Sequence, residues 1–153
     1  MRPCAQSDTA RAGTFGLKTA ILENKVVYVD MNDCPAQLDI LAHVDVVPAG
    51  DGWSVTEPFV PLFRDGKLYG RGTCDDKGPA VAALYAMRAV RELNISLKYN
   101  VCLILGADEE TGCRDTDCYY SHFKEAPCSY SPDGEYPVIN LEKGGLGCYE
   151  QVM

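Results

Sequence analysis

The first 70 residues of the chain contain short β-prone runs joined by turn signals. FGLKTAILE (15–23) and KVVYVDM (25–31) are rich in β-branched and aromatic residues and are separated by Asn24, which predicts a tight hairpin. PLFRDGKLYG (61–70) holds the pair Asp65–Gly66 between two more β-prone pieces. An Asp-Gly pair in this setting is a strong hairpin signal, so the pattern predicts two hairpins.

Two longer apolar runs, LDILAHVDVV (38–47) and NVCLILGA (100–107), predict strands that are buried on both faces. Between these two runs, apolar side chains recur at helical spacing from Pro79 to Leu93, which predicts a helix. A second helix is expected after the second run, over 113–124. The segment 129–139 is rich in turn residues and leads into another extended piece. The pattern predicts an α/β fold with a mixed, mostly parallel sheet and flanking helices.

Composition narrows the class of protein. The chain has 153 residues, 46% hydrophobic and 24% charged, values typical of a globular protein that forms one compact unit. A net charge of −8 with scattered basic residues disfavours nucleic-acid binding. No apolar window approaches the ~20 residues that span a bilayer, and the first residues lack the apolar core of an export signal. We therefore expect a cytoplasmic location and no membrane contact.

The eight cysteines form no C-x-x-C pair, and with no export signal we expect reduced thiols. Cys74 precedes a pair of aspartates, so we consider it as a direct zinc ligand and favour the alternative of a small buried filler. His122 matches no ligand motif and is expected on a helix surface or in packing.

Two motifs place possible metal ligands at the ends of predicted elements. His43 and Asp45 are two residues apart on a strand, so both side chains face the same way and the carboxylate can orient the imidazole. For an isolated His-x-Asp, a structural histidine is the commoner explanation. Asp75 and Asp76 in GRGTCDDKGP (70–79) follow a glycine-rich turn and precede a helix, which favours a bound cation over a phosphate. Helix N-capping is the alternative.

Two further acidic motifs complete the pattern. Asp108, Glu109 and Glu110 crowd like charges at the end of an apolar strand, which is costly unless cations or shared protons relieve the repulsion. A solvated loop explains them equally well in isolation. Asp133 in SPDGEYP (131–137) alone resembles an ordinary Asx turn. The joint occurrence of four donor clusters at strand ends and turns predicts a metal site.

Together, four motifs resemble the zinc-dependent dipeptidases and deacylases, a family that includes peptidase V-like dipeptidases, carnosinases and acetylornithine deacetylases. The motifs are HVDVVPAGDGW, LYGRGTCDDKGP, ADEETG and SPDGEYPVINLEKG. They follow the family's order over about residues 38–147, and four linked motifs are far more specific than one. The resemblance implies the N-terminal part of a zinc aminopeptidase-like catalytic domain.

The resemblance also implies a set of metal ligands. His43 and Asp133 would bind one zinc ion, Glu110 would bind the other, and Asp75 would bridge the two. Zn²⁺ is the expected cofactor, two ions per complete site, with Mn²⁺ or Co²⁺ as alternatives. Two such ions about 3.5–4 Å apart lower the pKa of a shared water toward ~7.

The remaining roles implied by the resemblance are catalytic. Glu109 would act as general base toward that water and return the proton to the leaving amine. Asp45 would steady His43, and the peptide bond between Asp75 and Asp76 would be cis. The implied reaction is hydrolysis of the amide bond of a dipeptide, with a small peptide as the partner and no prediction of oligomeric state.

Family members carry one more zinc-binding histidine downstream and an inserted lid domain, neither of which matches this sequence. We therefore expect residues 1–153 to be a partial catalytic domain that lacks the lid domain and the C-terminal half. Within it the second zinc has only Glu110 and Asp75, too few for a closed site, so binding should be asymmetric and activity weak or absent. Deacylation of N-acyl amino acids and a non-catalytic remnant are the alternative functions.

Overall fold

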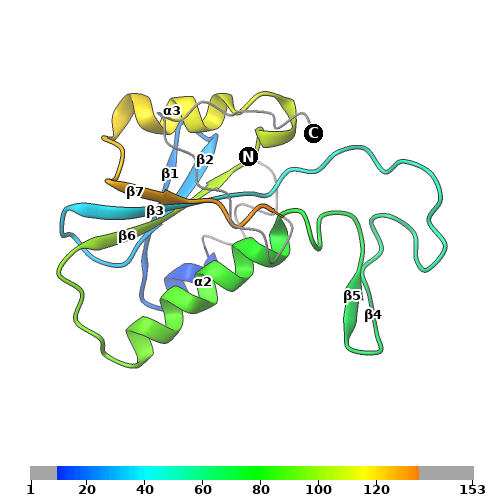
Figure 1. Ribbon diagram of the computed structural model, residues 1–153, viewed down its shortest axis with the longest axis horizontal. Coiled ribbons are helices and arrows are strands. Elements are labelled where there is room, and N and C mark those ends of the chain that lie inside the picture. Colours follow the sequence, from blue (N-terminus) through cyan, green and yellow to red (C-terminus); the bar gives the residue numbers. More distant parts are fainter. Residues whose placement is uncertain (1–9, 135–153) are drawn as a thin grey trace.

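The computed structural model describes residues 10–134, which form a three-layer arrangement around a five-stranded sheet (Figure 1). The strand order is β1-β2-β6-β3-β7, with bounds β1 Lys18–Leu22, β2 Val26–Asp30, β6 Asn100–Gly106, β3 Ala36–His43 and β7 Cys128–Tyr130. β6, β3 and β7 pair in parallel, whereas β2 is antiparallel to both β1 and β6. Only β2 therefore runs against the other strands, and the predicted mixed, mostly parallel sheet is confirmed.

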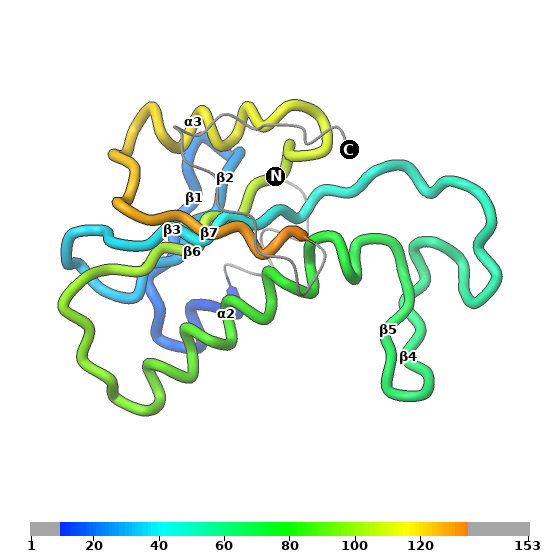
Figure 2. The backbone as a smooth tube through the Cα atoms, viewed as in Figure 1, coloured from blue at the N-terminus to red at the C-terminus, as the bar shows by residue number. Residues whose placement is uncertain are grey.

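Both predicted hairpins form. In the β1–β2 turn, Glu23 and Asn24 have φ of 45° and 59°, and the Lys25 N–H donates to the Leu22 carbonyl oxygen. Two consecutive residues of positive φ match the right-handed twist of paired strands, which is why Asn24 was a useful signal. The second hairpin joins β4 (Leu62–Arg64) to β5 (Lys67–Tyr69) and projects away from the sheet (Figures 1 and 2).

Helices α2 (Lys77–Glu92) and α3 (Arg114–His122) cover opposite faces of the sheet (Figure 1). α2 buries Leu84 and Met87 against one face, and α3 buries Tyr119 against the other. Alternate residues of β6 serve the two layers because strand side chains alternate in direction. Leu103 and Leu105 pack in the α2 layer and Cys102 and Ile104 in the α3 layer. This double burial explains the continuous apolar run of β6.

The structure shortens one predicted element. The apolar run 38–47 was predicted to be strand throughout, but β3 ends at His43. The Val44 N–H still donates to the Gly106 carbonyl oxygen. After that residue the chain leaves the sheet, and the Asp45 carboxylate takes hydrogen bonds from the loop that follows β6. His43 and Asp45 therefore lie at and just beyond the strand end, not within one strand.

Candidate metal centre

His43 is held rigidly at the carboxyl end of β3. Its side chain is only 2% exposed, and its backbone N–H donates to Asp76 Oδ2 at 3.1 Å. Asp76 is itself fully buried and occupies the N-cap position of α2, where its side chain makes no capping hydrogen bond. The peptide bond between Asp75 and Asp76 is cis, which confirms that prediction. One side chain thus connects the strand that carries His43 with the turn that carries Asp75.

Three carboxylates from three other segments surround the same imidazole nitrogen. His43 Nε2 lies 2.9 Å from Asp75 Oδ1, 3.5 Å from Asp133 Oδ2 and 3.8 Å from Glu109 Oε2. Asp75 precedes α2, Asp133 follows β7, and Glu109 opens the short 3-10 helix η1 (Glu109–Thr111) after β6. The carboxyl ends of parallel strands meet at one edge of a sheet, so residues up to 90 positions apart in sequence converge here.

Asp45 connects the imidazole to the acidic loop. Its Oδ1 lies 3.4 Å from His43 Nδ1, and its two oxygens accept the N–H groups of Glu109 at 3.3 Å and Glu110 at 3.2 Å. The Asp45 side chain is 3% exposed. It therefore acts on the imidazole and on the backbone of η1 at once, as the positioning partner of a metal-binding histidine does.

Glu110 lies beside the same centre. Its Oε1 accepts the backbone N–H of Val47 at 3.2 Å. Ligand atoms of His43, Glu109 and Glu110 lie within 4.8 Å of one another, as do those of His43, Asp75 and Asp133. The predicted ligands and the predicted base therefore fall into two groups that share the imidazole.

The donor set fits a divalent cation. Both ring nitrogens of His43 are buried and, in the described part of the chain, make ion-pair contacts with carboxylates but no well-aligned hydrogen bond. Asp76 Oδ1 is also buried without a hydrogen bond there. Buried polar atoms without partners are rare and costly. Imidazole nitrogen and carboxylate oxygen are ligands that zinc accepts, so a cation bound to His43 Nε2 and the carboxylates around it would satisfy that nitrogen, while Nδ1 faces Asp45.

Without a cation, the charges of the centre act on its own titrating groups. Burial opposes protonation of His43, but Asp133 and Glu109 outweigh it and raise the pKa of the imidazole to about 9. Burial raises the pKa of the Asp76 carboxyl to about 7 and also raises the pKa of Glu109. The centre therefore favours a bound positive charge, and without a metal ion this charge is a proton on His43.

Sequence reasoning missed two residues that shape the centre. Asp76 was considered as a cation-binding or helix-capping carboxylate, whereas its side chain anchors the backbone of His43. Asp115, 2% exposed in α3, accepts the N–H groups of Ala107 and, at 2.7 Å, Asp108, and so fixes the end of β6. No spacing signal marks Asp115. The cis bond implied for Asp75–Asp76 was the available hint for Asp76.

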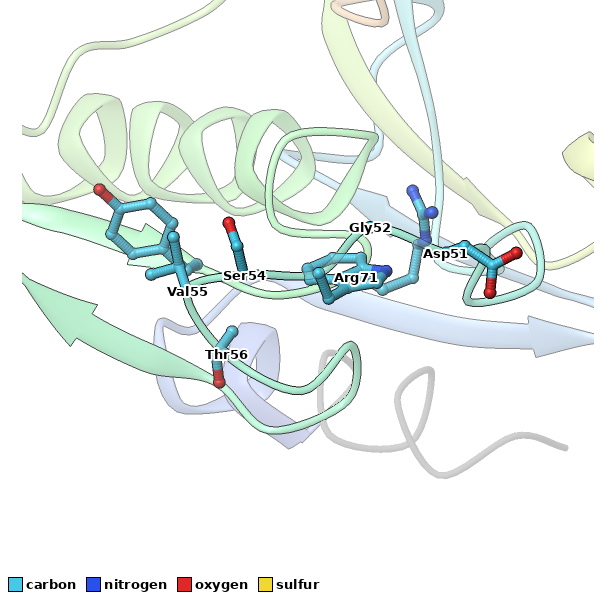
Figure 3. Close-up of a pocket in the computed structure, with 8 residues that line it drawn as sticks. Asp51, Gly52, Ser54, Val55, Thr56 and Arg71 are labelled. Carbon is cyan, nitrogen blue, oxygen red and sulfur yellow. The ribbon is translucent and has the colours of Figure 1, made fainter.

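A separate cavity of about 310 Å³ lies in the connection between β3 and α2 (Figure 3). Arg71 lies over the Trp53 ring at 5.3 Å, and both side chains donate to the Ala49 carbonyl oxygen. None of the residues that line the cavity belongs to the cluster around His43. We place the chemistry at the cluster because the cavity lacks a comparable set of converging donors.

The cysteines differ partly from expectation. Cys34, Cys74, Cys102, Cys118 and Cys128 are free thiols, but Cys113 is disulfide-bonded. The expectation of reduced thiols throughout was therefore wrong for Cys113, because chain spacing does not show which remote cysteines meet. Cys74 is exposed rather than buried, and it belongs to none of the metal-binding groups found among residues 10–134.

Comparison with known proteins identifies the family. Residues 40–142 match the model of Peptidase family M20/M25/M40. The chain belongs to this family. The M20 match covers the first three motifs and all but the last two residues of the fourth, and it confirms the resemblance to this peptidase family.

Curated relatives in the M20 family carry dipeptidase names. The Bacillus subtilis protein named "Putative dipeptidase YtjP" is 39% identical over 129 residues, which cover 84% of this chain and 28% of that protein. "Putative dipeptidase SSP1012" of Staphylococcus saprophyticus is 46% identical over 105 residues, 69% of this chain and 22% of that protein. The chain thus spans about a quarter of the length of these relatives.

Solved structures share the fold. Human carnosine dipeptidase 1 matches with a TM-score of 0.70 and 26% identity over 84% of this chain and 32% of that chain. The M20 family metallo-carboxypeptidase Sso-CP2 of Sulfolobus solfataricus matches with a TM-score of 0.71 and 27% identity, over 86% and 32%. The described residues thus form part of an M20-type fold. Among these residues, no helix is long and apolar enough to cross a membrane.

Proposed function

We propose that this chain supplies the metal-binding and proton-transfer part of an M20 dipeptidase, and that residues 1–153 are a portion of its catalytic domain. The observation that supports this proposal is the environment of His43 Nε2, which has carboxylate oxygens of Asp75, Asp133 and Glu109 as neighbours. The dipeptidase names of relatives such as YtjP and the carnosine dipeptidase fold support a dipeptide as substrate.

The ligand roles follow from the resemblance to the family, and the proximity of His43, Asp75 and Asp133 supports part of them. His43 and Asp133 would hold one zinc ion, Glu110 would hold a second, and Asp75, which lies closest to His43 Nε2, would bridge them. Two bound zinc ions would lower the pKa of a shared water and polarise the substrate carbonyl. Three protein groups for the first ion and two for the second leave positions open for water and substrate.

Glu109 is assigned as the proton carrier. Its carboxylate lies 3.8 Å from His43 Nε2 and is 44% exposed, so it borders the centre and remains accessible to a substrate. Burial raises its pKa, which suits a group that takes a proton from water and returns it to a leaving amine. The Glu109 backbone is fixed by Asp45, which holds the carboxylate in place relative to the ligands.

The test separates metal binding from proton transfer. Zinc binding to the chain is measured by calorimetry, and dipeptide hydrolysis by the release of free amino acids, in the wild type, His43→Asn and Glu109→Gln. Glu57→Gln, at an exposed glutamate outside the cluster, is the matched control. We expect slow, zinc-dependent hydrolysis in wild type and control, loss of tight zinc binding in His43→Asn, and retained binding without turnover in Glu109→Gln.

Two results would contradict this proposal. Zinc affinity that is unchanged in His43→Asn would show that the ion binds elsewhere. Turnover that persists in Glu109→Gln would remove the assigned base.

A further inference from the structure

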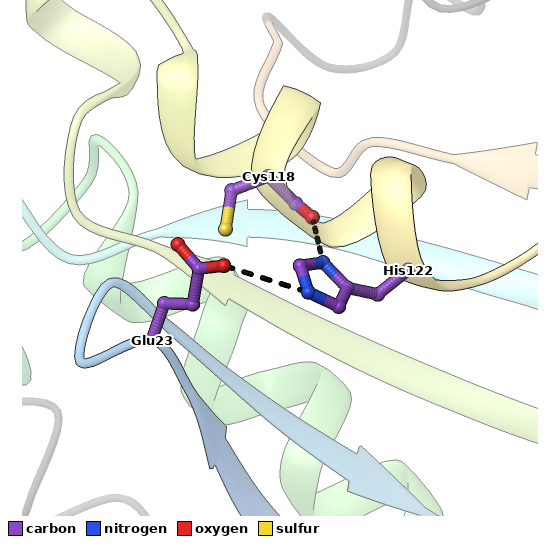
Figure 4. A group of neighbouring side chains, drawn as sticks. All are labelled: Glu23, Cys118 and His122. Carbon is purple, nitrogen blue, oxygen red and sulfur yellow. Dashed lines mark hydrogen bonds and ion pairs between the residues drawn. The ribbon is translucent and has the colours of Figure 1, made fainter.

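A second group of metal-binding side chains lies outside the centre around His43. Cys118 and His122 are four residues apart on α3, so they lie on one face of the helix. Glu23, in the β1–β2 turn, approaches them from the sheet (Figure 4). One ligand atom from each residue lies within 4.8 Å of the others. A thiol, an imidazole and a carboxylate from two elements thus converge on one point.

The hydrogen bonds of His122 settle which ring nitrogen faces that point. Nδ1 lies 3.0 Å from the Cys118 carbonyl oxygen, as Figure 4 shows. A carbonyl oxygen only accepts, so this contact places the proton on Nδ1. The Ser121 hydroxyl lies 3.0 Å from the same nitrogen and donates to the same carbonyl at 2.8 Å. Nε2 is then left with its lone pair, the form in which histidine binds metals.

That lone pair faces a negative oxygen. His122 Nε2 lies 3.4 Å from Glu23 Oε1. Two acceptors at this distance attract each other only when a cation or a second proton joins them. Bonds of about 2.0–2.1 Å place a nitrogen and an oxygen ligand of tetrahedral zinc about 3.4 Å apart. The observed separation therefore matches a shared metal ion, whereas it is long for a direct hydrogen bond.

The charges also suit a divalent ion. Lys25 Nζ lies 3.0 Å from Glu23 Oε2, the oxygen that does not face His122. Lys25 donates to that oxygen, so the Glu23 carboxylate is held with Oε1 directed toward His122. Cys118 is a free thiol, and a metal that binds its sulfur displaces one proton to solvent. Thiolate, carboxylate and neutral imidazole then carry two negative charges.

We propose that Glu23, Cys118 and His122 form a second transition-metal site, which takes a borderline ion such as Zn²⁺ or Co²⁺ and ties the β1–β2 turn to the end of α3. Mixed nitrogen, sulfur and oxygen donors favour such ions over Mg²⁺ or Ca²⁺. Three protein ligands leave the fourth position of a tetrahedral ion to water.

Cobalt titration distinguishes this site from the centre around His43. A cobalt–thiolate bond gives an intense near-ultraviolet charge-transfer band, whereas the carboxylates and imidazole around His43 give none. The 153-residue chain is titrated with Co²⁺ beside Cys118→Ser, His122→Gln and Cys74→Ser. Cys74 is an exposed free cysteine next to the bridging ligand, so its variant is the matched control.

We expect the band in the wild type and in Cys74→Ser, with a saturating intensity that corresponds to one cobalt–thiolate bond per chain. We expect its loss in Cys118→Ser and at least tenfold weaker binding in His122→Gln. His122 is 43% exposed, so its replacement tests binding without a risk to folding. Absence of the band from the wild type, or its persistence in Cys118→Ser with native circular dichroism, would overturn the proposal. Either result leaves the assignment of the centre around His43 unaffected.

Discussion

Replacement of Asp45 by Asn tests whether this side chain organises the metal centre. Asp45 is buried and accepts the backbone N–H groups of Glu109 and Glu110. Hydrogen bonds to a charged acceptor contribute roughly 1.5–3 kcal/mol each. Asparagine keeps one acceptor oxygen but turns an NH₂ group toward the second backbone donor. The change therefore converts one charged bond to a neutral one and replaces the other by a contact between donors.

The expected loss follows from these two bonds. At 3.2–3.3 Å they are long, so we use the lower end of the range: roughly 1.5 kcal/mol for the bond that is lost and roughly 0.5 kcal/mol for the bond that becomes neutral, or roughly 2 kcal/mol in total. Removing the negative charge relieves repulsion of Glu109 but also removes the attraction of the protonated His43 imidazole 3.4 Å away, so these two effects oppose each other. We expect the free energy of unfolding to fall by about 2 kcal/mol. With a urea m-value of about 1–3 kcal/mol per M, the midpoint should fall by roughly 1 M.

Equilibrium unfolding in urea, with the metal removed by EDTA, measures this change directly. Asp51→Asn is the control because Asp51 is exposed in a loop, where substitutions usually shift stability by less than about 0.5 kcal/mol. In the zinc-loaded protein, Asp45→Asn should also weaken zinc binding by about 10–100-fold. If both variants unfold at the wild-type midpoint, the hydrogen bonds of Asp45 do not hold the centre together.

Three further predictions test the centre. In metal-free protein, His43 has a pKa of about 9 against 6.5 for the ordinary group, so its stabilising effect is complete below pH 6.5 and is lost as the pH rises through 9. The free energy of unfolding should fall by about 3 kcal/mol over that pH range. His43→Asn should reduce this dependence on pH, and an equal dependence in the variant would show that His43 is not the group that titrates. Zinc calorimetry of the Cys118→Ser variant, which removes the thiol ligand of the other proposed site, should give one tight and one weak site at the centre around His43. Adding Asp133→Asn should abolish the tight one, and two equal tight sites in Cys118→Ser would exclude the asymmetric ligand set. Gly106→Ala would place a Cβ 2.6 Å from Asp115 Oδ2. Chemical denaturation should therefore show a free energy of unfolding that is lower by roughly 1–3 kcal/mol. An unchanged free energy of unfolding would show that Asp115 can move aside.

Local sequence signals predicted the elements that short-range interactions determine, such as the two hairpins. The two hairpins follow from Asn24 and from Asp65–Gly66, which occupy positions of positive φ. The run 100–107 predicted β6 because that strand is covered by a helix layer on each face. The end of β3 was not predictable in this way, because it depends on hydrogen bonds between Asp45 and a loop more than 60 residues away.

The centre could be predicted because its ligands lie at the ends of elements and in linked motifs. His43, Asp75 and Asp133 were expected together, and the structure brings them together; their roles as ligands stay predictions. The cluster of Glu23, Cys118 and His122 could not be found from spacing alone. Only Cys118 and His122 are near in sequence, and nothing in the pattern shows that a hairpin turn meets the last turn of α3.

The position of β7 at the edge of the sheet links assembly to chemistry. Within residues 10–134, Cys128–Tyr130 pairs on one side only, with Leu38–Ile40. Asp133 follows three residues after Tyr130, so the backbone that carries this carboxylate is an extension of an edge strand. A strand added along that edge, whether from the same chain or another, would stiffen the backbone leading to Asp133. A strand that pairs far from His43 would thereby restrict the positions that the Asp133 carboxylate can take beside the imidazole.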